Sequence, residues 1–463
     1  MNNLKISNSL TRSKDLFQPI NPKNITMYVC GPTVYADPHI GNGRSLIVFD
    51  LLYRVLIKLY GKKNITYVRN ITDVDDKIIE ISKTKATPIE KITSDVVKIF
   101  HENVKDLNCL EPTSEPKATD HIKEMIEMIN SLIEKKIAYV NNGHVYFLIS
   151  EFKNYGKLSN KKLDDLIAGS RVEISKLKKN PLDFVLWKPA LANEPGWDSP
   201  WGRGRPGWHL ECSVMSEKYL GKKFDIHGGG LDLLFPHHEN EIAQSCANNS
   251  SDILANYWVH NGFLTMNKEK MSKSLGNTET ISDVLCKYNG QVIRLALLSA
   301  HYKQPLDWNN NLLEQSKATL EKWYELYDDV ETKIDNNNVF SCLLDDLNTP
   351  KYFAKLHELY NSASKGDETK RIEFNGACRL IGIFNQKRDV LFKQKQAASN
   401  VDKIYISEKI KERTNARNKG DFVLADKIRD ELSKNGIDIK DKDNKTEWEY
   451  KWAKKKYTFL TQH

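Results

Sequence analysis

The stretch Ile25–Gly61, ITMYVCGPTVYADPHIGNGRSLIVFDLLYRVLIKLYG, decides the fold of this chain. It opens with a short apolar run that favours a strand and continues into a segment full of turn residues. Apolar side chains then recur at helical spacing until Gly61; they are Leu46, Phe49, Tyr53 and Ile57. A second strand-like run, NITYVRNIT (64–72), follows. This order of strand, turn, helix and strand predicts the start of a parallel α/β unit.

The pattern changes after this unit. From about Asp120 to Arg205, pieces such as HVYFLIS and DFVLWKP predict an insertion of short helices and hairpins, and α/β character returns at KFDIHGGG (223–230). After about Asn310 the periodicity becomes helical. The predicted boundaries are 1–119 and 206–310 for the two halves of the α/β domain, 120–205 for the insertion, and 311–400 and 401–463 for two C-terminal parts.

Three signals define the C-terminal helices. One predicted helix face consists of Leu313, Leu320, Tyr324 and Tyr327. Thr349-Pro350 is predicted to supply the N-cap and the first residue of a further helix. Asp421 is predicted to cap a helix that closes at Gly436, followed by the basic and aromatic segment TEWEYKWAKKKYTF.

Composition limits the class of protein. The chain has 463 residues, enough for two to four domains, with 40% hydrophobic and 28% charged residues. It contains no run of about 18 apolar residues, and its opening residues lack a signal-peptide pattern, so we expect a cytoplasmic protein outside the membrane. Seven dispersed cysteines favour reduced thiols, and a formal charge of +8 suits a polyanionic partner without requiring one. We expect a monomer.

His39-Ile40-Gly41-Asn42 falls where the first strand turns into the helix. In an open α/β sheet, backbone amides and the helix dipole attract phosphate at this place. Gly41 and Gly43 would let a nucleotide approach the backbone, and His39 could donate a hydrogen bond to phosphate. An ordinary glycine-rich turn with a surface histidine is the alternative.

Lys270-Met271-Ser272-Lys273-Ser274 lies far downstream in a polar, loop-like segment. Lys270 and Lys273 could neutralise the charge that develops on departing pyrophosphate. A solvated basic loop is the alternative. A histidine-bearing turn together with a distant KMSKS loop resembles the class I aminoacyl-tRNA synthetases, whose two motifs bracket the ATP triphosphate.

Thiol, imidazole and carboxylate groups recur in three further segments. The candidate metal ligands are Cys30, Cys212, His237, His238, Glu239 and Glu241. Such a mixture suits zinc, and His237 and Glu241 are one helical turn apart, so that both can face one ion. Two buried thiols and a polar helix are the alternative that spacing alone leaves open.

The complete set of motifs is more specific. The following strings occur in order: YVCGPTVY, YVRNITDVDDKII, ATDHI, DFVLWK, GWHLECS, HGGGLDLLFPHHENEIAQS, KMSKSLGN, LDDLNTP and DFVLADKIRDEL. They resemble cysteinyl-tRNA synthetases throughout. The resemblance implies an α/β fold: a Rossmann-type parallel-sheet catalytic domain with an inserted connective subdomain, then a helical C-terminal region. Residues 311–400 would contact the tRNA stem and residues 401–463 the anticodon.

The resemblance also implies the chemistry. L-cysteine would react with ATP, accompanied by Mg²⁺, to form an adenylate, and cysteine would then pass to tRNA-Cys. One zinc ion per chain would recognise the thiol, held by Cys30, Cys212, His237 and Glu241, with His238 and Glu239 in supporting or packing positions. Trp208 would wall the pocket, and Thr72 would lie near the bound cysteine. The residues expected to support catalysis are His39, Asn42, Lys270 and Lys273.

A further glycine-rich stretch completes the expected ATP site. Gly229, Gly230 and Asp232 resemble the class I stretch beneath the nucleotide, where the carboxylate could meet a ribose hydroxyl or the substrate amine. A tight glycine turn after the strand is the alternative. The expected ATP-binding residues are therefore Gly41, Gly43, Gly229, Gly230, Asp232 and Lys273.

Asn42 departs from the family pattern, which more usually has histidine there. Asparagine can donate a similar hydrogen bond but carries no charge, so weaker phosphate contacts are expected. Three rival functions agree less well with the sequence. A ligase joining cysteine to an aminosugar would not need the helical C-terminal part, a non-catalytic RNA-binding relative should have lost Lys270 and Lys273, and a generic nucleotidylyltransferase would not explain the cysteine, histidine and glutamate set.

Overall fold

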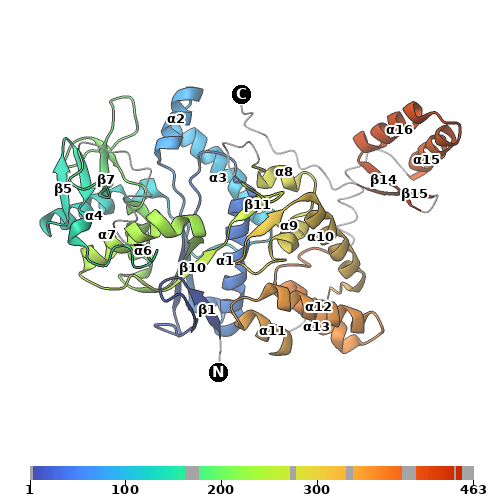
Figure 1. The fold of residues 1–463 in the computed structure, drawn as a ribbon, viewed down its shortest axis with the longest axis horizontal. Coiled ribbons are helices and arrows are strands. Elements are labelled where there is room, and N and C mark those ends of the chain that lie inside the picture. The colour runs from blue at the N-terminus through green and yellow to red at the C-terminus, as the bar shows by residue number, and fades with distance from the viewer. Residues whose placement is uncertain are drawn as a thin grey trace.

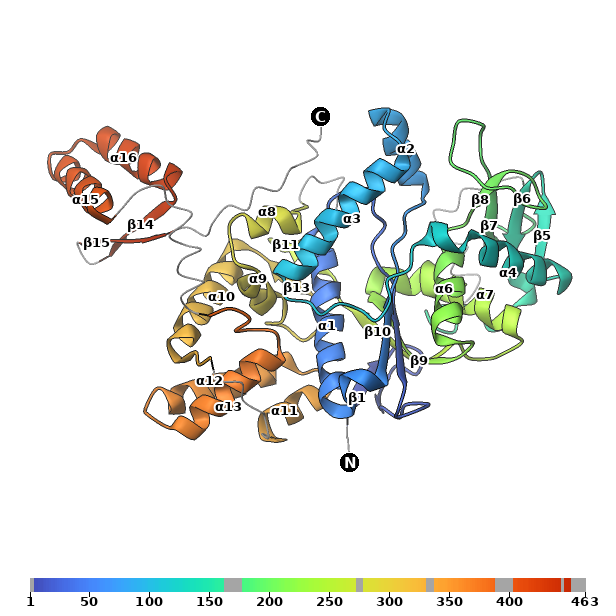
Figure 2. The same cartoon turned by 180° about the vertical axis from the view of Figure 1, so that it is seen from behind.

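The computed structural model describes residues 4–161, 177–271, 278–329, 337–387, 403–442 and 445–450. Figure 1 shows a central sheet with helix α1 beside it, an inserted unit on one side, helices on the other, and a C-terminal unit lying apart. Figure 2 shows the same arrangement from behind. Within the described residues, no helix is long and apolar enough to cross a membrane.

The central sheet has four parallel strands in the order β10-β9-β3-β4. They are β3 (Ile25–Val29), β4 (Ile65–Arg69), β9 (Phe224–Gly230) and β10 (Ala255–Asn261). The predicted parallel α/β fold is confirmed. Because β3–β4 and β9–β10 run to opposite sides, the strand order reverses between β3 and β9, and ligands of open α/β sheets bind at the carboxyl ends beside such a reversal. The fold therefore places a site between Cys30 and Gly230.

Helix α1 (Ile40–Tyr60) connects β3 to β4. The predicted face is buried at Leu46, Phe49 and Tyr53, but Leu52 and Val55 are buried as well. The helix contacts the sheet on one side and α9 (Gly290–Leu297) on another, so it is covered almost all round. A helix enclosed in this way is apolar around its circumference and needs no polar face.

The segment after β4 leads through two helices into the inserted unit. Helices α2 (Asp76–Lys85) and α3 (Ile89–Asp106) come first. The inserted unit then consists of α4 (Ile122–Glu134) and an antiparallel sheet in the order β5-β6-β7-β8. Its strands are β5 (Ala138–Asn141), β6 (His144–Phe147), β7 (Phe184–Pro189) and β8 (Gly204–Pro206). The insertion is separate from the parallel sheet and carries its own hydrogen-bonded strands, as predicted for the HVYFLIS and DFVLWKP segments.

Smaller elements complete the region around the parallel sheet. Helices α6 (Leu210–Leu220) and α7 (Glu239–Asn249) pack on each other and on α4. A three-stranded sheet is formed by β11 (Leu264–Met266), β12 (Glu269–Lys270) and β13 (Leu306–Trp308), with α8 (Ile281–Leu285) nearby in sequence. An N-terminal hairpin pairs β1 (Lys5–Asn8) with β2 (Ser13–Leu16).

The chain becomes helical after β13, as predicted. The helices are α10 (Asn310–Trp323), α11 (Asn337–Leu344), α12 (Thr349–Ala363) and α13 (Glu368–Leu380). Leu313 and Leu320 are buried, but α10 ends before Tyr324, which begins a short 3₁₀ turn. The predicted cap of α12 is wrong by one residue, because the Asn348 side chain accepts from the Lys351 N–H at 3.1 Å, whereas the Thr349 hydroxyl donates to another segment.

The C-terminal unit contains α15 (Lys403–Asn418), α16 (Phe422–Lys434) and the hairpin β14 (Ile437–Lys442)–β15 (Lys445–Tyr450). Asp421 caps α16 by accepting from the Leu424 N–H at 3.0 Å, and Gly436 follows with a φ of 79°. The hairpin was not predicted. A small core of its own holds the unit together, formed by Ile406, Ile428, Leu432, Ile437 and Ile439.

Candidate active site

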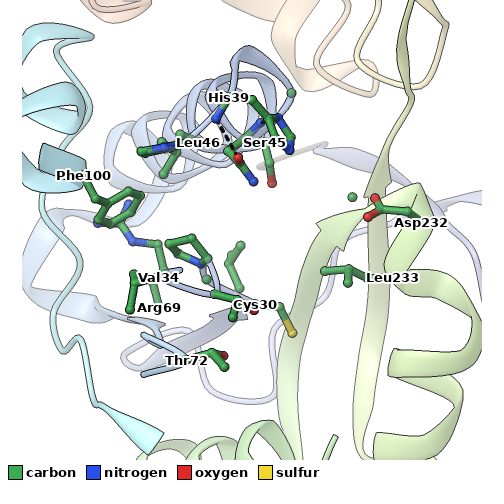
Figure 3. Close-up of a pocket in the computed structure, with 18 of the residues that line it drawn as sticks. Cys30, Val34, His39, Ser45, Leu46, Arg69, Thr72, Phe100, Asp232 and Leu233 are labelled. Carbon is green, nitrogen blue, oxygen red and sulfur yellow. Dashed lines mark hydrogen bonds between the residues drawn. The ribbon is translucent and has the colours of Figure 1, made fainter. Parts of the chain in front are cut away.

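A pocket of about 560 Å³ opens at the carboxyl ends of β3 and β9. Figure 3 shows His39 at the start of α1 on one side of this pocket, Asp232 on the other, and Cys30 between them. The lining therefore comes from segments far apart in the sequence, which the reversal of strand order brings together.

The turn at the start of α1 is held by reciprocal hydrogen bonds between His39 and Asn42. His39 is the N-cap: its Nδ1 accepts from the Asn42 N–H at 3.3 Å, while the Asn42 Oδ1 accepts from the His39 N–H at 3.0 Å. This capping box satisfies two N–H groups at the helix start. Both residues line the pocket. The Asn42 Oδ1 is used by the cap, so the Nδ2 amide is the group that can donate to a ligand.

The downstream motif meets this turn directly. A Cβ added at Gly41 would lie 2.7 Å from the Met271 Cε, so glycine is needed there for the close approach. On the C-terminal side of residues 272–277, the Ile40 N–H donates to Glu279 O at 2.9 Å, and the Ile281 N–H donates to Pro38 O at 2.9 Å. The described residues on both sides of this gap thus contact the start of α1, and Lys273 lies outside the described residues. Lys270 ends β12.

The remaining predicted nucleotide residues divide into two groups. Gly230 and Asp232 line the pocket. Gly43 is buried in α1, where an added Cβ would touch Ile281 at 3.4 Å, and an added Cβ at Gly229 would meet the His238 ring at 2.8 Å. These last two glycines therefore permit packing behind the pocket wall.

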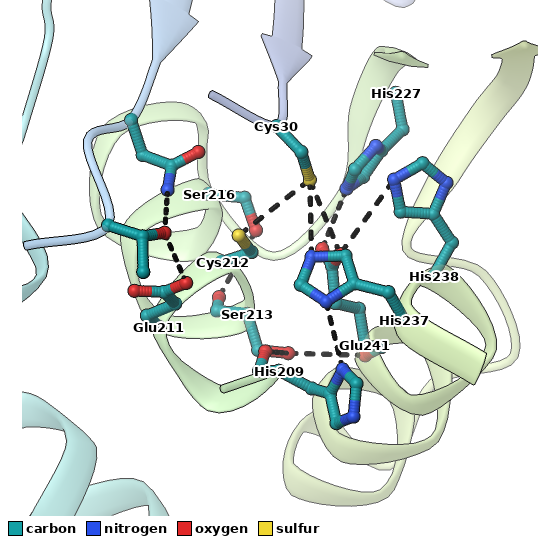
Figure 4. A network of polar contacts seen from close by, with 12 residues as sticks. Cys30, His209, Glu211, Cys212, Ser213, Ser216, His227, His237, His238 and Glu241 are labelled. Carbon is teal, nitrogen blue, oxygen red and sulfur yellow. Dashed lines mark hydrogen bonds and ion pairs between the residues drawn. The ribbon is translucent and has the colours of Figure 1, made fainter. Parts of the chain in front are cut away.

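The predicted metal ligands converge in space. Figure 4 shows the Cys30 thiol pointing at Cys212, His237 and Glu241. The Cys30 Sγ lies 3.7 Å from the Cys212 Sγ, 3.5 Å from the His237 Nε2 and 3.5 Å from the Glu241 Oε1. The His237 Nε2 and the Glu241 Oε1 are 3.0 Å apart. Residues up to 211 positions apart in sequence thus offer one buried ligand set.

The spacing of these atoms fits zinc. Bond lengths of about 2.0–2.3 Å in a tetrahedral site put neighbouring ligand atoms roughly 3.3–3.8 Å apart. The three separations from the Cys30 Sγ, 3.5–3.7 Å, fall within that range, and the 3.0 Å between the His237 Nε2 and the Glu241 Oε1 is slightly shorter. A second possible set, Cys30, His227, His238 and Glu241, shares two members. Three members of the first set line the pocket, Cys30, Cys212 and His237, whereas Cys30 alone of the second set does so.

Two histidines that the sequence analysis did not identify orient the ligands. The His209 Nδ1 lies 2.8 Å from the His237 Nδ1, which leaves the His237 Nε2 to face the set. The His227 Nε2 lies 2.7 Å from the Glu241 Oε2, which leaves Oε1 to face it. Partners of this kind fix the direction of metal ligands. Both histidines lie within quoted motif strings, GWHLECS and HGGGLDLLFPHHENEIAQS, and that position was the available signal.

His238 and Glu239, the other two candidate ligands, lie outside this set. The His238 Nδ1 is 2.8 Å from the His260 Nε2, and burial lowers the pKa of both rings. The Glu239 carboxylate accepts from the backbone N–H groups of Gly156 and Ser159 at 2.9 and 2.8 Å. His238 thus supports the interior behind the ligands, and Glu239 fastens the inserted unit to α7.

Charges in the set are tightly balanced. Burial raises the pKa of Cys30, and the nearby Cys212 and Glu241 raise it further. Burial would also raise the pKa of Cys212, but the hydrogen bond from Cys30 and the charge of His237 lower it to about 6. Burial opposes ionisation of Glu241, yet His227 and His237 hold its pKa well below the usual range. Cys30 is therefore held as a neutral thiol while Cys212 and Glu241 favour their anionic forms, so a cation bound by all three would displace the Cys30 proton.

The wall beside the ligands carries polar and aromatic groups. The Thr72 hydroxyl donates to the buried Glu211 carboxylate at 2.5 Å, and burial raises the pKa of Glu211. The Trp208 ring lies 4.5 Å from the His237 ring and is 41% exposed. Thr72, Trp208 and Glu211 all line the pocket. Glu211 was missed, since a glutamate inside a helix usually faces solvent.

Residues 16–318 match the family described as tRNA synthetases class I (C) catalytic domain. The chain is 56% identical over 449 residues to the cysteine–tRNA ligase of Pelagibacter ubique, covering 96% of this chain and 99% of that protein. It is 49% identical over 457 residues to the cysteine–tRNA ligase of Beijerinckia indica subsp. indica, covering 97% and 99%. The solved Mycobacterium tuberculosis methionyl-tRNA synthetase in complex with methionyl-adenylate aligns with a TM-score of 0.53 at 12% identity, covering 78% and 89%, a similarity of fold alone.

Proposed function

Because the chain belongs to the cysteine–tRNA ligase family of class I aminoacyl-tRNA synthetases, we propose that it forms cysteinyl-tRNA in two steps through cysteinyl-adenylate. In the first step, a carboxylate oxygen of cysteine attacks the α-phosphorus of ATP, and the bond to the β-phosphate oxygen breaks to release pyrophosphate. In the second, a hydroxyl of the terminal ribose of tRNA-Cys attacks the carbonyl carbon, and AMP leaves.

One observation carries this proposal: a single pocket reaches from the buried cysteine, histidine and glutamate set to the turn where the two ATP motifs meet. The thiol of a bound cysteine can therefore lie at one end while its carboxylate points towards the nucleotide end. Such placement lowers the barrier by holding the reacting groups in line.

The nucleotide end supplies charge stabilisation. His39 and the amide of Asn42 would donate to phosphate oxygens at the positive end of α1. Lys270 and Lys273 would neutralise the pyrophosphate as the bond breaks, and Mg²⁺ would accompany ATP as part of the substrate. Gly230 and Asp232 would meet the ribose or the amino group from the opposite wall. No covalent protein intermediate is required.

The other end provides selection for cysteine. Cys30, Cys212, His237 and Glu241 would hold zinc, which when bound prefers a thiolate ligand to a hydroxyl. His209 and His227 would keep the imidazole and the carboxylate directed at the set. Trp208 would close the pocket over His237, and Thr72 would lie beside the substrate, with its hydroxyl hydrogen already donated to Glu211. An apolar pocket alone would separate cysteine from its close analogue serine by only about 1–3 kcal/mol of binding free energy.

The test is ATP/pyrophosphate exchange measured with a panel of amino acids, together with the metal content of the same preparation. We expect exchange with cysteine, scarcely detectable exchange with serine, and one zinc ion per chain. Exchange dependent on a different amino acid would refute the proposed substrate. Full preference for cysteine over serine in chelator-treated, metal-free protein would refute the role given to zinc while leaving the ligase reaction in place.

A further inference from the structure

Arg44 is a fully buried arginine two residues beyond Asn42, and its guanidinium is surrounded by backbone carbonyls. Its Nη1 donates to the carbonyl oxygens of Gly262 and Phe263 at 3.0 and 2.6 Å. Its Nη2 donates to the carbonyl oxygens of His301, Tyr302 and Gln304 at 3.4, 3.3 and 2.5 Å. One side chain thus holds five carbonyl groups.

No carboxylate within the described part of the chain forms an ion pair with Arg44, although a buried charge is normally paired. Burial lowers its pKa to about 10, so the guanidinium stays protonated at neutral pH. The five carbonyl groups satisfy the hydrogen bonds of the guanidinium but do not neutralise its charge, so burying it costs free energy. This cost points to a need for the geometry that Arg44 imposes.

The carbonyls belong to two neighbouring segments, one of which lines the pocket. Gly262 and Phe263 join β10 to β11 and line the pocket, and residues 301–304 join α9 to β13. The segments touch: the Gly262 N–H donates to Tyr302 O at 2.8 Å, and β11 pairs with β13. Strand β11 in turn pairs with β12, which ends at Lys270 beside Met271.

We propose that Arg44 is a positioning residue for adenylate formation: it fixes the β11–β12 hairpin, which carries Lys270, against the start of α1. The inference rests on the proposed function, because the hairpin and the helix start are the two sides between which ATP would react. Arg44 is not among the residues that line the pocket, so it would contact neither ATP nor cysteine. It acts by keeping the His39 turn and the lysine-bearing hairpin at one fixed separation.

The direct test is Arg44→Lys. Lysine keeps the charge but offers three donors on a flexible stem in place of a planar fork of five, so it cannot hold both segments. We expect kcat of cysteine-dependent ATP/pyrophosphate exchange to fall on the order of 10²-fold, with KM for ATP and cysteine changed less than about threefold. A purely structural role would lower the melting temperature and leave kcat per folded molecule unchanged.

Arg294→Lys is the matched control. Arg294 is also fully buried and donates to Leu107 O and Asn108 O at 3.2 and 3.3 Å, and it pairs with Asp50. None of these groups lines the pocket. We expect this variant to lose thermal stability while keeping the wild-type kcat. An equal loss of kcat in both variants would overturn the assignment.

Gly262→Ala provides a second route if Arg44→Lys fails to fold. An added Cβ would lie 2.6 Å from Lys303 O and 2.9 Å from Gln304 O, so it would push the two segments apart with Arg44 unchanged. The same selective fall in kcat is expected, and wild-type kcat in this variant would overturn the proposal. Absence of cysteine-dependent exchange in the wild-type protein would instead refute the proposed function, which keeps the two failures distinct.

Discussion

Asn42 shows how one residue can serve both the fold and the proposed chemistry. Its Oδ1 closes the cap of α1 by accepting from the His39 N–H. Its Nδ2 amide is the donor left for the pocket that it lines. The sequence suggested only a weakened phosphate ligand at this position. The structure adds a capping role that requires an acceptor on the side chain.

Asn42→Asp separates these two roles. Aspartate keeps the Oδ1 acceptor and adds negative charge to the first turn, which favours the helix. The same charge would repel the triphosphate. We expect an unchanged or raised melting temperature and a fall in exchange on the order of 10²-fold. Asn42→Ala should lose about 1 kcal/mol of stability through the lost cap. Thermal unfolding and exchange on the same samples check both, and wild-type exchange in Asn42→Asp would exclude Asn42 from phosphate binding.

Cys212→Ser tests the ligand set. A hydroxyl is a poor replacement for a thiolate ligand, so zinc content and cysteine-dependent exchange should fall together, each by at least about tenfold. The matched control is Cys246→Ser, at a buried cysteine of α7 outside the set, where burial raises the thiol pKa to about 11. That variant should keep its zinc. Retention of full zinc by Cys212→Ser would remove Cys212 from the proposed ligands.

Part of this site could be predicted from residues alone. His237 and Glu241 are four residues apart, which indicates a common face, but nothing in the spacing selects Cys30 and Cys212, 182 positions apart. The family resemblance made that selection, and the distances agree with it. His209, His227 and Glu211 escaped prediction because their roles depend on ring and carboxylate orientation, which only three-dimensional packing defines.

At the scale of elements, the helix start and the β11–β12 hairpin form a joint. Met271 lies against Gly41, and His39 pairs with Thr280. Lys273 lies between these two contacts in the sequence. The contacts therefore support the proposal that Lys273 acts at the N-terminus of α1.

Lys273→Ala should lower kcat of exchange on the order of 10²-fold while leaving melting temperature and zinc unchanged, because a loop charge would stabilise the transition state and not the core. Lys268→Ala is the control, at an exposed lysine of the β11–β12 hairpin. Its loss should change exchange by less than about twofold, since surface substitutions away from special features have small effects. Near-normal exchange in Lys273→Ala would remove this lysine from the mechanism.

Periodicity predicted elements best where it was long. The strand, turn and helix from Ile25 to Gly61 are present as expected, because burial on the sheet requires that pattern. The N-cap of α12 is Asn348 and not the predicted Thr349, because the Thr349 hydroxyl donates to the Ala300 carbonyl. The β14–β15 hairpin was missed because it is short and its pairing is set by the small core of the unit, not by a strong local signal.

At the scale of the whole molecule, the topology explains why distant motifs meet. The inserted unit interrupts the chain between β4 and β9, yet β9 pairs with β3. Sequence analysis could recognise the return of α/β character after the insertion. It could not give the strand order, because that depends on which strands pair across the gap. The proposed domain boundaries remain predictions.

Removal of the C-terminal unit tests the proposed separation of the activation step from tRNA recognition. The unit has its own core, formed around Ile406, Ile428 and Ile437, and none of its described residues lines the pocket. A chain ending at residue 387 should therefore keep cysteine-dependent exchange within about twofold, because the reacting groups of the first step are all retained.

Charging of tRNA-Cys by the shortened chain should fall on the order of 10²-fold in kcat/KM, since the lost unit is proposed to bind the anticodon by charge and stacking.

A point variant tests the same proposal in the full-length chain. Phe422 is 64% exposed at the start of α16, whereas Trp448 is packed against the small core, so Phe422 is the better stacking surface. Phe422→Ala should lower the rate of tRNA-Cys charging about tenfold and leave ATP/pyrophosphate exchange unchanged. Ile404→Ala is the aliphatic control, at a side chain that is 70% exposed on α15. Unchanged charging by the shortened chain would place tRNA recognition in the catalytic and helical regions, whereas loss of exchange would show that the unit supports the fold of the pocket.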